Sequence, residues 1–389
     1  MAILMLVHAL APPTLGGTPI ILQRLLAGLP GIELEVVTDR RLRAAVKRGG
    51  ERVLAGRYRY FAKWPGPGRR WLPGRVVLAA LDVALAIVAG VRAGCWARRD
   101  GARWVMSVPD EGFSVIAGAV AARIARRPHV IFVFDLWEEN AYSEVDRWVA
   151  RRVERRIWRD AAAIVGHAQT LVDHYSRKHG VTPHAIPTPI DLAAASPVGA
   201  PRVRRPDEPR EVLFGGALYW AQAEALERLA RVCRSMDGVT LTVVGDEHSA
   251  RAAGVLADRY EQRLSPGDFR ARVAAADVAF LGLSFDSPRP EVVATATPAR
   301  LPEYMASGTP ILVHAPADSH VARYARTEDF AEVVDQADDD ALAAGLEMVL
   351  ADGVRSKLRA DRARRLAIER HDTDRVCARL AAILAGIAS

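Results

Sequence analysis

The 389-residue sequence has few cysteines, fewer acidic than basic residues, and no long uninterrupted apolar run. Its three cysteines, Cys95, Cys233 and Cys377, are scattered and form no Cys-x-x-Cys pair, which argues against a disulfide scaffold or a zinc cluster and fits a reducing cytoplasm. The most apolar stretch, residues 76–91, carries Asp82 in its middle and is shorter than the roughly 20 residues that a spanning helix needs. We therefore expect no membrane span and no structural metal. Residues 1–8 lack a basic start and a cleavage site, so we expect a first strand and no secretion signal.

The shortage of acidic residues leaves a positive chain. Lys and Arg number 53 against 46 Asp and Glu, a formal charge of +7, which favours anionic partners such as phosphates, lipid headgroups or nucleic acid. Half of the residues are apolar and a quarter are charged, so the chain can build a sizeable core. Its length predicts two domains.

Short apolar runs alternate with helical patterns along both halves of the chain. This alternation predicts βαβ units and parallel sheets covered on both sides, hence an α/β fold. It breaks at residues 193–210, which are rich in Ala, Pro, Ser, Gly and charge and predict a linker. We expect a first domain over 1–195, a second over 196–370 and a terminal helix within 371–389. The predicted strands are 3–8, 34–38, 130–135, 162–165, 211–214, 240–244, 278–284, 311–314 and 332–335.

A glycine pair follows the first strand of each half. Gly16-Gly17 precedes the first predicted helix, and Gly215-Gly216 stands at the equivalent place of the second half. Glycine permits close backbone approach, and a helix start offers unpaired N–H groups, so both loops are candidates for phosphate contact. Either pair could instead be a tight turn. Neither matches G-x-G-x-x-G, so the sequence gives no direct support for a nicotinamide cofactor.

Residues 295–314 contain the most informative pattern. Pro302 and Gly308 suit the start and the left-handed end of a short helix, so the amides of residues 299–304 would gather at one end and could hold a diphosphate. Glu303 falls in the first turn, where a carboxylate can accept two O–H hydrogen bonds from a ribose diol. The alternative is that Glu303 only complements the helix dipole.

The segment Leu301-Pro-Glu-Tyr-Met-Ala-Ser-Gly-Thr-Pro310 resembles the donor-binding signature of glycosyltransferase family 4. The resemblance continues along the chain in the loop ending at Gly17, in the strand end 134–137, and in the segments 186–191, 243–245 and 276–278. It implies the GT-B fold, in which two Rossmann-like parallel-sheet domains face a cleft and the terminal helix crosses back to the first domain. It also implies retaining transfer from a nucleotide-diphospho-sugar, with no metal and no cofactor.

Carried over to this sequence, the resemblance places Asp135 near the acceptor as a candidate catalytic residue, and we take Arg300 as a second candidate. The donor-binding residues that it implies lie in both halves. The acceptor that we expect is a glycan, a lipid-linked molecule or a small molecule. The candidate donor-binding residues are Gly16, Gly17, Gly215, Gly216, Thr295, Thr297, Ala299, Leu301 and Glu303.

Three positions depart from the family pattern. Thr295 stands where the first glutamate of an E-x7-E pair belongs, residues 217–226 contain no Arg or Lys, and Phe134 replaces a histidine. We expect Arg300 and the helix amides to replace the missing positive charge at the leaving group. The departures keep open a rival function, a GT-B protein that binds a nucleotide or glycan without transfer. An enzyme of this fold that epimerises or hydrolyses a nucleotide sugar is a further rival.

Residues 57–75 interleave basic and aromatic residues and contain no acidic residue. This pattern suits an anionic membrane surface, and it equally suits a solvated loop. Nucleic acid is the weaker interpretation, because no RNA- or DNA-binding motif accompanies the segment. The expected location is the cytoplasm, with peripheral attachment to the inner face of the membrane.

Overall fold

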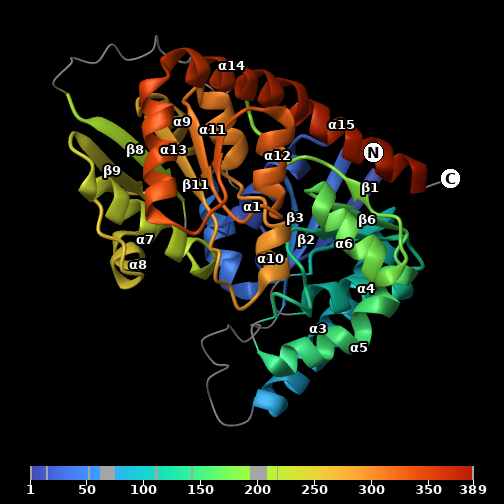
Figure 1. Ribbon diagram of the computed structural model, residues 1–389. Helices are drawn as coiled ribbons and strands as arrows, with labels where there is room; N and C mark the ends of the chain where they lie inside the picture. The colour runs from blue at the N-terminus through green and yellow to red at the C-terminus, as the bar shows by residue number, and fades with distance from the viewer. Residues whose placement is uncertain are drawn as a thin grey trace. The chain divides into compact units, whose positions relative to one another are not determined.

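The computed structural model describes residues 2–14, 16–50, 53–61, 75–109, 113–141, 143–192, 208–216 and 218–387 (Figure 1). The chain divides into two compact units: Met1–Pro189 with Thr373–Ser389, and Ile190–Asp372. The boundaries predicted from the sequence lie after residues 195 and 370. Most of the expected linker, residues 193–207, lies outside the described residues, as do residues 62–74 of the basic and aromatic segment.

The first unit contains a seven-stranded parallel sheet in the order β3-β2-β1-β4-β5-β6-β7. Its strands are β1 (Ala2–Val7), β2 (Ile32–Asp39), β3 (Gly56–Phe61), β4 (Trp104–Ser107), β5 (His129–Val133), β6 (Ala163–Gly166) and β7 (His184–Ala185). Its α-helices are α1 (Gly17–Ala27), α2 (Arg43–Arg48), α3 (Arg75–Asp100), α4 (Ser114–Ala125), α5 (Glu144–Asp160), α6 (Gln169–His179) and α15 (Thr373–Ile387).

The second unit contains a six-stranded parallel sheet in the order β10-β9-β8-β11-β12-β13. Its strands are β8 (Arg210–Gly215), β9 (Val239–Val244), β10 (Arg259–Glu261), β11 (Val278–Gly282), β12 (Ile311–His314) and β13 (Glu332–Val334). Its helices are α7 (Trp220–Ser235), α8 (Glu247–Ala252), α9 (Pro266–Ala274), α10 (Pro290–Thr295), α11 (Leu301–Ser307), α12 (His320–Glu328), α13 (Asp339–Ala351) and α14 (Gly353–Arg370).

Burial on both faces explains why the central strands are continuous apolar runs. Every residue of β5, β11 and β12 is buried, and the second sheet lies between two apolar clusters, one around Tyr304 and Leu281 and one around Phe280 and Leu226. Helices on both faces of a parallel sheet account for this pattern. The predicted α/β class with two Rossmann-like parallel-sheet domains is therefore confirmed.

The terminal helix α15 belongs to the first unit, where it packs on α1. The Sγ of Cys377 lies 3.2 Å from the carbonyl oxygen of Leu25, and it also lies against Gly28. A Cβ at Gly28 would come within 2.6 Å of this sulfur, so the close approach of the two helices requires glycine there.

The first part of the basic and aromatic segment, residues 57–61, forms the edge strand β3. Arg59 pairs with Glu35 and Asp100 and stacks over the ring of Trp96 at 4.8 Å. Intramolecular contacts therefore already occupy Arg59, one of the basic residues of this segment.

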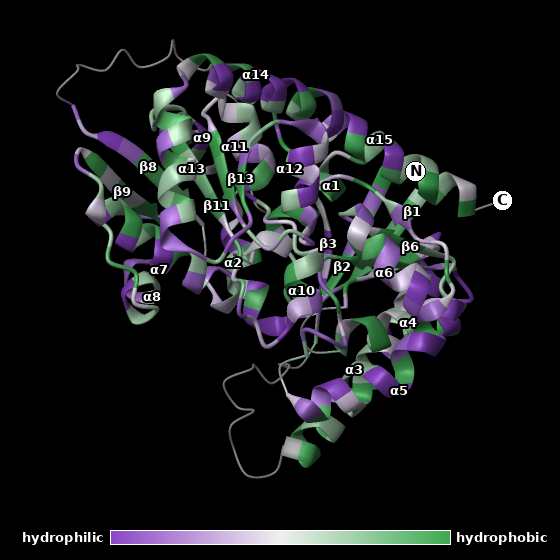
Figure 2. Ribbon diagram, in the orientation of Figure 1, coloured by the Kyte–Doolittle hydropathy of each residue, from purple (hydrophilic) through white to green (hydrophobic). Residues whose placement is uncertain are grey.

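Helix α3 is longer than the apolar run seen in the sequence. Over Val76–Asp100 it is long and apolar enough to cross a bilayer by length and composition, and a third of its most apolar window is buried inside the protein. The apolar residues of α3 appear green in Figure 2. The prediction that this segment is too short to span a bilayer is therefore wrong with respect to its length.

Candidate functional site

The connections in the second sheet change direction between β8 and β11. The chain leaves β8 toward β9 on one side and leaves β11 toward β12 on the other. In open α/β sheets the crevice beyond the carboxyl ends of two such strands is the usual ligand site. Gly215-Gly216 ends β8, and the segment that leads to Arg300 follows β11, so the topology brings both candidate segments to this point.

The glycine loop is shaped by close contacts that exclude larger residues. Gly216 has a φ of 117°, and a Cβ there would lie 2.6 Å from the guanidinium of Arg300. A Cβ at Gly215 would lie 2.2 Å from the ring of Phe269, and one at Gly245 would lie 2.6 Å from the carbonyl oxygen of Gly216. At Gly215, Gly216 and Gly245 the backbone can thus lie close to neighbouring groups because these residues carry no side chains.

The guanidinium of Arg300 packs against Gly216 of this loop. Its Cζ is 4.5 Å from the ring centroid of Phe214, and its Nη2 donates to Oε1 of Gln222, on the first turn of α7, at 3.2 Å. Burial lowers the pKa of the Arg300 guanidinium, and the charge of nearby Arg263 acts in the same direction. An arginine remains protonated at neutral pH, so the site holds a partly desolvated positive charge.

Tyr304 ties α11 to the glycine loop. Its hydroxyl accepts a hydrogen bond from the amide of Gly215 at 2.8 Å, and burial raises the pKa of this phenol. The 16-residue helix α7 begins just beyond the loop, and no side chain caps its N-terminus. Its first amides and its dipole therefore suit an anion.

Some backbone amides in the first turn of α11, which the sequence predicts to be available to a diphosphate, already donate hydrogen bonds within the protein. The Leu301 amide donates to the carbonyl of Pro298 at 2.9 Å, and the Tyr304 amide donates to the carbonyl of Arg300 at 3.0 Å. Ala299 and Arg300 precede the helix, which has only seven residues. The role of these amides toward a diphosphate stays a prediction.

Glu303 is buried and lies 3.4 Å from Nη1 of Arg270, a buried residue of α9. The same Nη1 donates to the carbonyl oxygen of Asp191. Arg270 is not among the site residues predicted from the sequence. Its only sign there is a basic residue next to apolar residues in a short helix. A ribose at Glu303 would have to share the carboxylate with this arginine, and the ribose role of Glu303 stays a prediction.

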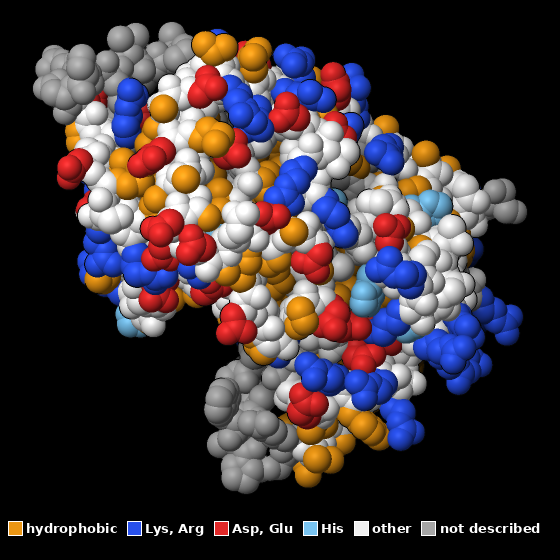
Figure 3. Space-filling view, in the orientation of Figure 1, with side chains coloured by type: hydrophobic (Ala, Val, Ile, Leu, Met, Phe, Trp, Pro, Cys, Tyr) orange, Lys and Arg blue, Asp and Glu red, His pale blue; other side chains and the backbone are white. Residues whose placement is uncertain are grey.

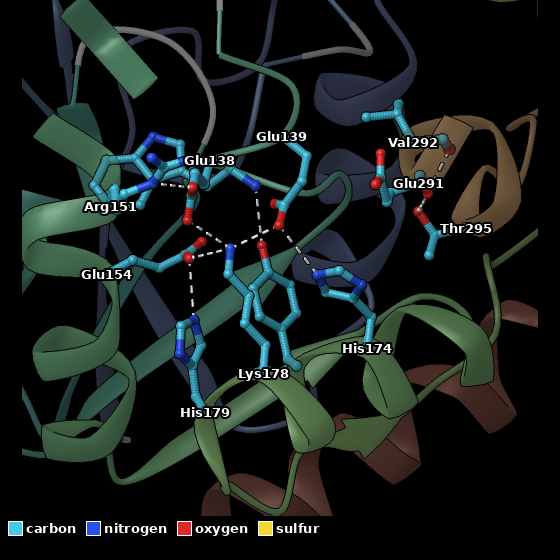
Figure 4. Close-up of polar contacts among 12 residues, drawn as sticks. Glu138, Glu139, Arg151, Glu154, His174, Lys178, His179, Glu291, Val292 and Thr295 are labelled. Atoms are coloured by element: carbon cyan, nitrogen blue, oxygen red, sulfur yellow. Dashed lines mark hydrogen bonds and ion pairs between the residues drawn. The ribbon is translucent and has the colours of Figure 1, made fainter. Parts of the chain in front are cut away.

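The two threonines of the predicted signature differ in their contacts. Thr295 is buried at the end of α10, and its hydroxyl lies 2.9 Å from the Glu291 carbonyl and 3.4 Å from that of Val292 (Figure 4). The hydroxyl oxygen of Thr297 is buried and has no hydrogen-bond partner among the described residues.

In the first unit the equivalent change of direction falls between β1 and β4. Gly16, with a φ of 150°, is the N-cap of α1, and Gly17 is its first residue. Among the residues that the structure describes, no side chain caps this helix, so its start also suits an anion. Leu15, in the same loop, lies outside the described residues.

Asp135 is exposed just after β5, whereas Trp137, two residues on, is buried. The Trp137 ring stacks on Trp158 at 5.8 Å, and its amide donates to the hydroxyl of Tyr175 at 2.9 Å. Trp137 is part of the core, where it anchors the loop that carries Asp135.

A cluster of carboxylates around Lys178 fixes the rest of this loop (Figure 4). The ammonium of Lys178 lies 3.0 Å from Glu138, 2.7 Å from Glu139 and 2.7 Å from Glu154. Burial opposes its charge, but the carboxylates of Glu154 and Glu139 outweigh that effect and raise the pKa of Lys178. Burial likewise opposes ionisation of Glu139, yet hydrogen bonds from His174 and Lys178 lower its pKa to about 2.

The described residues contain no group of three or more His, Cys, Asp or Glu side chains that could hold a metal ion.

No family model matches the sequence, and none of the curated proteins compared with it does. Solved structures do match over the whole length. Sucrose-phosphate synthase from Thermosynechococcus elongatus aligns with a TM-score of 0.73 and 15% identity, covering 100% of this chain and 99% of that one. HepE from Anabaena, solved with UDP and glucose, aligns with a TM-score of 0.68 and 16% identity over 99% of this chain and all of that one.

A glycosyltransferase from Rickettsia africae aligns equally well, with a TM-score of 0.68 and 10% identity, covering 99% of this chain and 98% of that one. These similarities extend through both parallel-sheet units. The chain has the GT-B fold. At such low identity the comparison establishes architecture, and a fold alone does not define a reaction.

Proposed function

We propose that this protein is a glycosyltransferase that takes its sugar from a nucleotide-diphospho-sugar. The observation that carries the proposal is the meeting of Gly215-Gly216, Arg300 and the uncapped start of α7 at the point where the second sheet changes direction. Close-packed glycines, a partly desolvated arginine and a helix start that no described side chain caps form a site suited to a diphosphate. HepE, which shares the fold, was solved with UDP-glucose, and this supports the choice of ligand class.

The proposed chemistry needs positive charge at the leaving group. When the bond between the sugar C1 and the diphosphate oxygen breaks, negative charge grows on the diphosphate, and Arg300 with the α7 amides would stabilise it. A hydroxyl oxygen of the acceptor then bonds to C1 on the same face, and its proton leaves with the diphosphate. Arg263 is near enough to add to the positive field. We propose this retaining route with no metal and no cofactor.

Asp135 is proposed to orient the acceptor. It is exposed at the end of β5, on a loop held by Trp137 and the Lys178 cluster, where an ionised carboxylate can accept the hydrogen of a hydroxyl group. The acceptor class remains a glycan, a lipid-linked molecule or a small molecule, and the proposed location is the cytoplasm.

One observation favours the rival, a protein that binds a nucleotide or glycan without transfer. The Thr295 hydroxyl donates to carbonyls of its own helix, so its hydrogen is already used and it brings no carboxylate charge to a donor sugar. The contact that a glutamate would make at this position, as the family resemblance implies, is therefore absent.

The decisive experiment incubates the purified protein with UDP-, ADP- and GDP-sugars and measures nucleoside diphosphate release with and without candidate acceptors. Acceptor-dependent release supports transfer. Tight nucleotide binding without release indicates the binding protein, and release without acceptor indicates hydrolysis or another reaction of the nucleotide sugar. If no nucleotide binds, the proposed site is wrong.

A further inference from the structure

Helix α3 buries mainly small residues and exposes six of its nine large aliphatic residues. The inward residues lie against α4, and a Cβ at Gly90 or Gly94 would come within 2.6 Å of α4 atoms. The inward set is Ala79, Ala86, Ala89, Gly90, Ala93, Gly94 and Ala97, and the exposed set is Val76, Val77, Leu81, Ile87, Val88 and Val91. An ordinary surface helix shows the opposite arrangement, because its large apolar residues face the core.

The exposed set forms a continuous stripe. Val77, Leu81, Val88 and Val91 recur at helical spacing, and Val77 and Val88 are 63% and 54% exposed. Over 15 residues such a stripe extends for about 22 Å. Contiguous apolar surfaces of this kind mark interaction sites, whereas single exposed apolar residues are ordinary.

Positive charge flanks this stripe. Helix α5 packs beside α3 and presents Trp148, which is 58% exposed, with Arg152 stacked over its ring at 5.0 Å. Arg152, Arg155 on α5 and Arg92 on α3 are exposed and form no ion pair with any residue that the structure describes. Figure 3 shows hydrophobic side chains next to Lys and Arg side chains over the end of the molecule where α3 and α5 lie.

We propose that the outward face of α3, with Trp148 and the arginines of α5, binds the surface of an anionic lipid bilayer. The aliphatic stripe would enter the acyl boundary, and Arg92, Arg152 and Arg155 would contact the headgroups. The helix lies in the plane of the surface because its glycine face is packed along α4 and Asp82 is buried beneath it, so it cannot leave the protein to span.

Charge distinguishes this partner from a second copy of the chain. An isologous contact through the stripe would bring the same arginines of two protomers together, and like charges oppose such an interface. An anionic headgroup layer presents the opposite charge. The proposal rests on α3 and α5 alone and does not depend on the proposed transferase activity.

Flotation of the full-length protein with lipid vesicles tests the proposal. We expect binding to vesicles of equal parts phosphatidylglycerol and phosphatidylcholine, and much weaker binding to phosphatidylcholine alone. The double variant Val77→Gln/Val88→Gln should weaken binding about tenfold or more, because two exposed aliphatic side chains no longer enter the acyl boundary. The matched control is Val354→Gln/Leu358→Gln on α14, where residues 75% and 65% exposed lie in the other unit.

A second variant tests the charged flank. Arg152→Gln/Arg155→Gln should weaken binding to anionic vesicles and reduce its dependence on salt, with no effect on phosphatidylcholine. Circular dichroism confirms that each variant is folded. The proposal is overturned if the wild type binds neither vesicle, if Val77→Gln/Val88→Gln binds as well as the control, or if sedimentation shows that this variant dissociates a dimer.

Discussion

The guanidinium of Arg300 occupies the space that a side chain at position 216 would fill. A Cβ on Gly216 would lie 2.6 Å from the Arg300 Cζ, and the backbone there has a φ of 117°. The position of the Arg300 guanidinium therefore requires glycine at residue 216. Gln222 accepts a hydrogen bond from this guanidinium and holds it in place. Any residue other than glycine at 216 must displace the positive charge proposed to face the diphosphate.

Gly216→Ala should weaken nucleoside diphosphate binding about tenfold because it displaces Arg300. Gly238→Ala is the matched control, since Gly238 also has a positive φ of 70° but a Cβ there would meet no other atom within 4 Å. Both variants lose stability from backbone strain, about 1–2 kcal/mol. Calorimetric titration with UDP, ADP and GDP checks the difference, and equal affinities in both variants would contradict the arrangement.

Arg300→Ala should lower turnover far more than it weakens nucleoside binding. One preorganised donor to a developing negative charge contributes about 10²–10³ in rate, whereas the nucleoside itself does not need this arginine. Steady-state release of nucleoside diphosphate, together with nucleoside affinity, measures the two effects. Arg300→Lys should restore part of the rate, because it retains a charge without the planar fork. Equal losses in turnover and affinity would remove the proposed role.

Most of the fold could be predicted because buried parallel strands are short, β-branched and apolar. The run 311–314 coincides with β12, and 278–284 exceeds β11 by two residues. The edge strand β3 was missed because its Arg and Tyr residues suggested a surface segment, whereas Arg59 is paired inside the unit. An edge strand has no second neighbour and needs no apolar run.

The site was harder to predict, because its partners are distant in sequence. Two elements, β11 and α10, separate the helix that carries Arg270 from the helix that carries Glu303, and no local pattern indicates that the two residues pair. The outward face of α3 was missed for a different reason. Composition shows that the helix is apolar. The face that packs against the protein is decided by the small residues that allow α4 to approach.

The ion pair between Arg270 and Glu303 allows a test of ribose recognition that is independent of stability. Glu303→Gln should destabilise the second unit by about 3–5 kcal/mol, because it leaves a buried arginine without its countercharge. If Glu303 also holds the ribose, the wild type prefers a ribonucleotide over its 2′-deoxy analogue, and this preference falls in the variant. The ratio of the two affinities, measured below the unfolding range, reports the contact. An unchanged ratio would show that the pair is structural.

Glu139 should make the first unit sensitive to acid. Its pKa of about 2 is below the ordinary carboxyl range, so its stabilising contribution is full above about pH 4.5 and disappears as the pH falls toward 2. Glu139→Gln should cost about 2–4 kcal/mol at pH 7 and little near pH 2, while Lys178 keeps Glu138 and Glu154 as partners. Urea unfolding followed by tryptophan fluorescence reports on this unit, which holds seven of the eight tryptophans.

The matched control for Glu139→Gln is Glu144→Gln, which removes an exposed carboxylate 3.1 Å from Arg147. A surface pair of this kind contributes little, so the control should unfold like the wild type at both pH values. If the difference in unfolding free energy between wild type and Glu139→Gln persists unchanged near pH 2, the effect of the substitution is steric and does not come from the charge.

The close approach of α15 to α1 predicts a compensating pair of substitutions. Gly28→Ala places a methyl group 2.6 Å from the Cys377 sulfur and should cost about 1–3 kcal/mol by overpacking. Cys377→Ala removes that sulfur and its contact with the Leu25 carbonyl, so alone it is also destabilising. Combined, the two changes should cost less than their sum, because the new methyl group enters the space that the sulfur leaves. Urea unfolding of all four proteins measures this coupling, and strict additivity would mean that the helices separate instead of accommodating the methyl group.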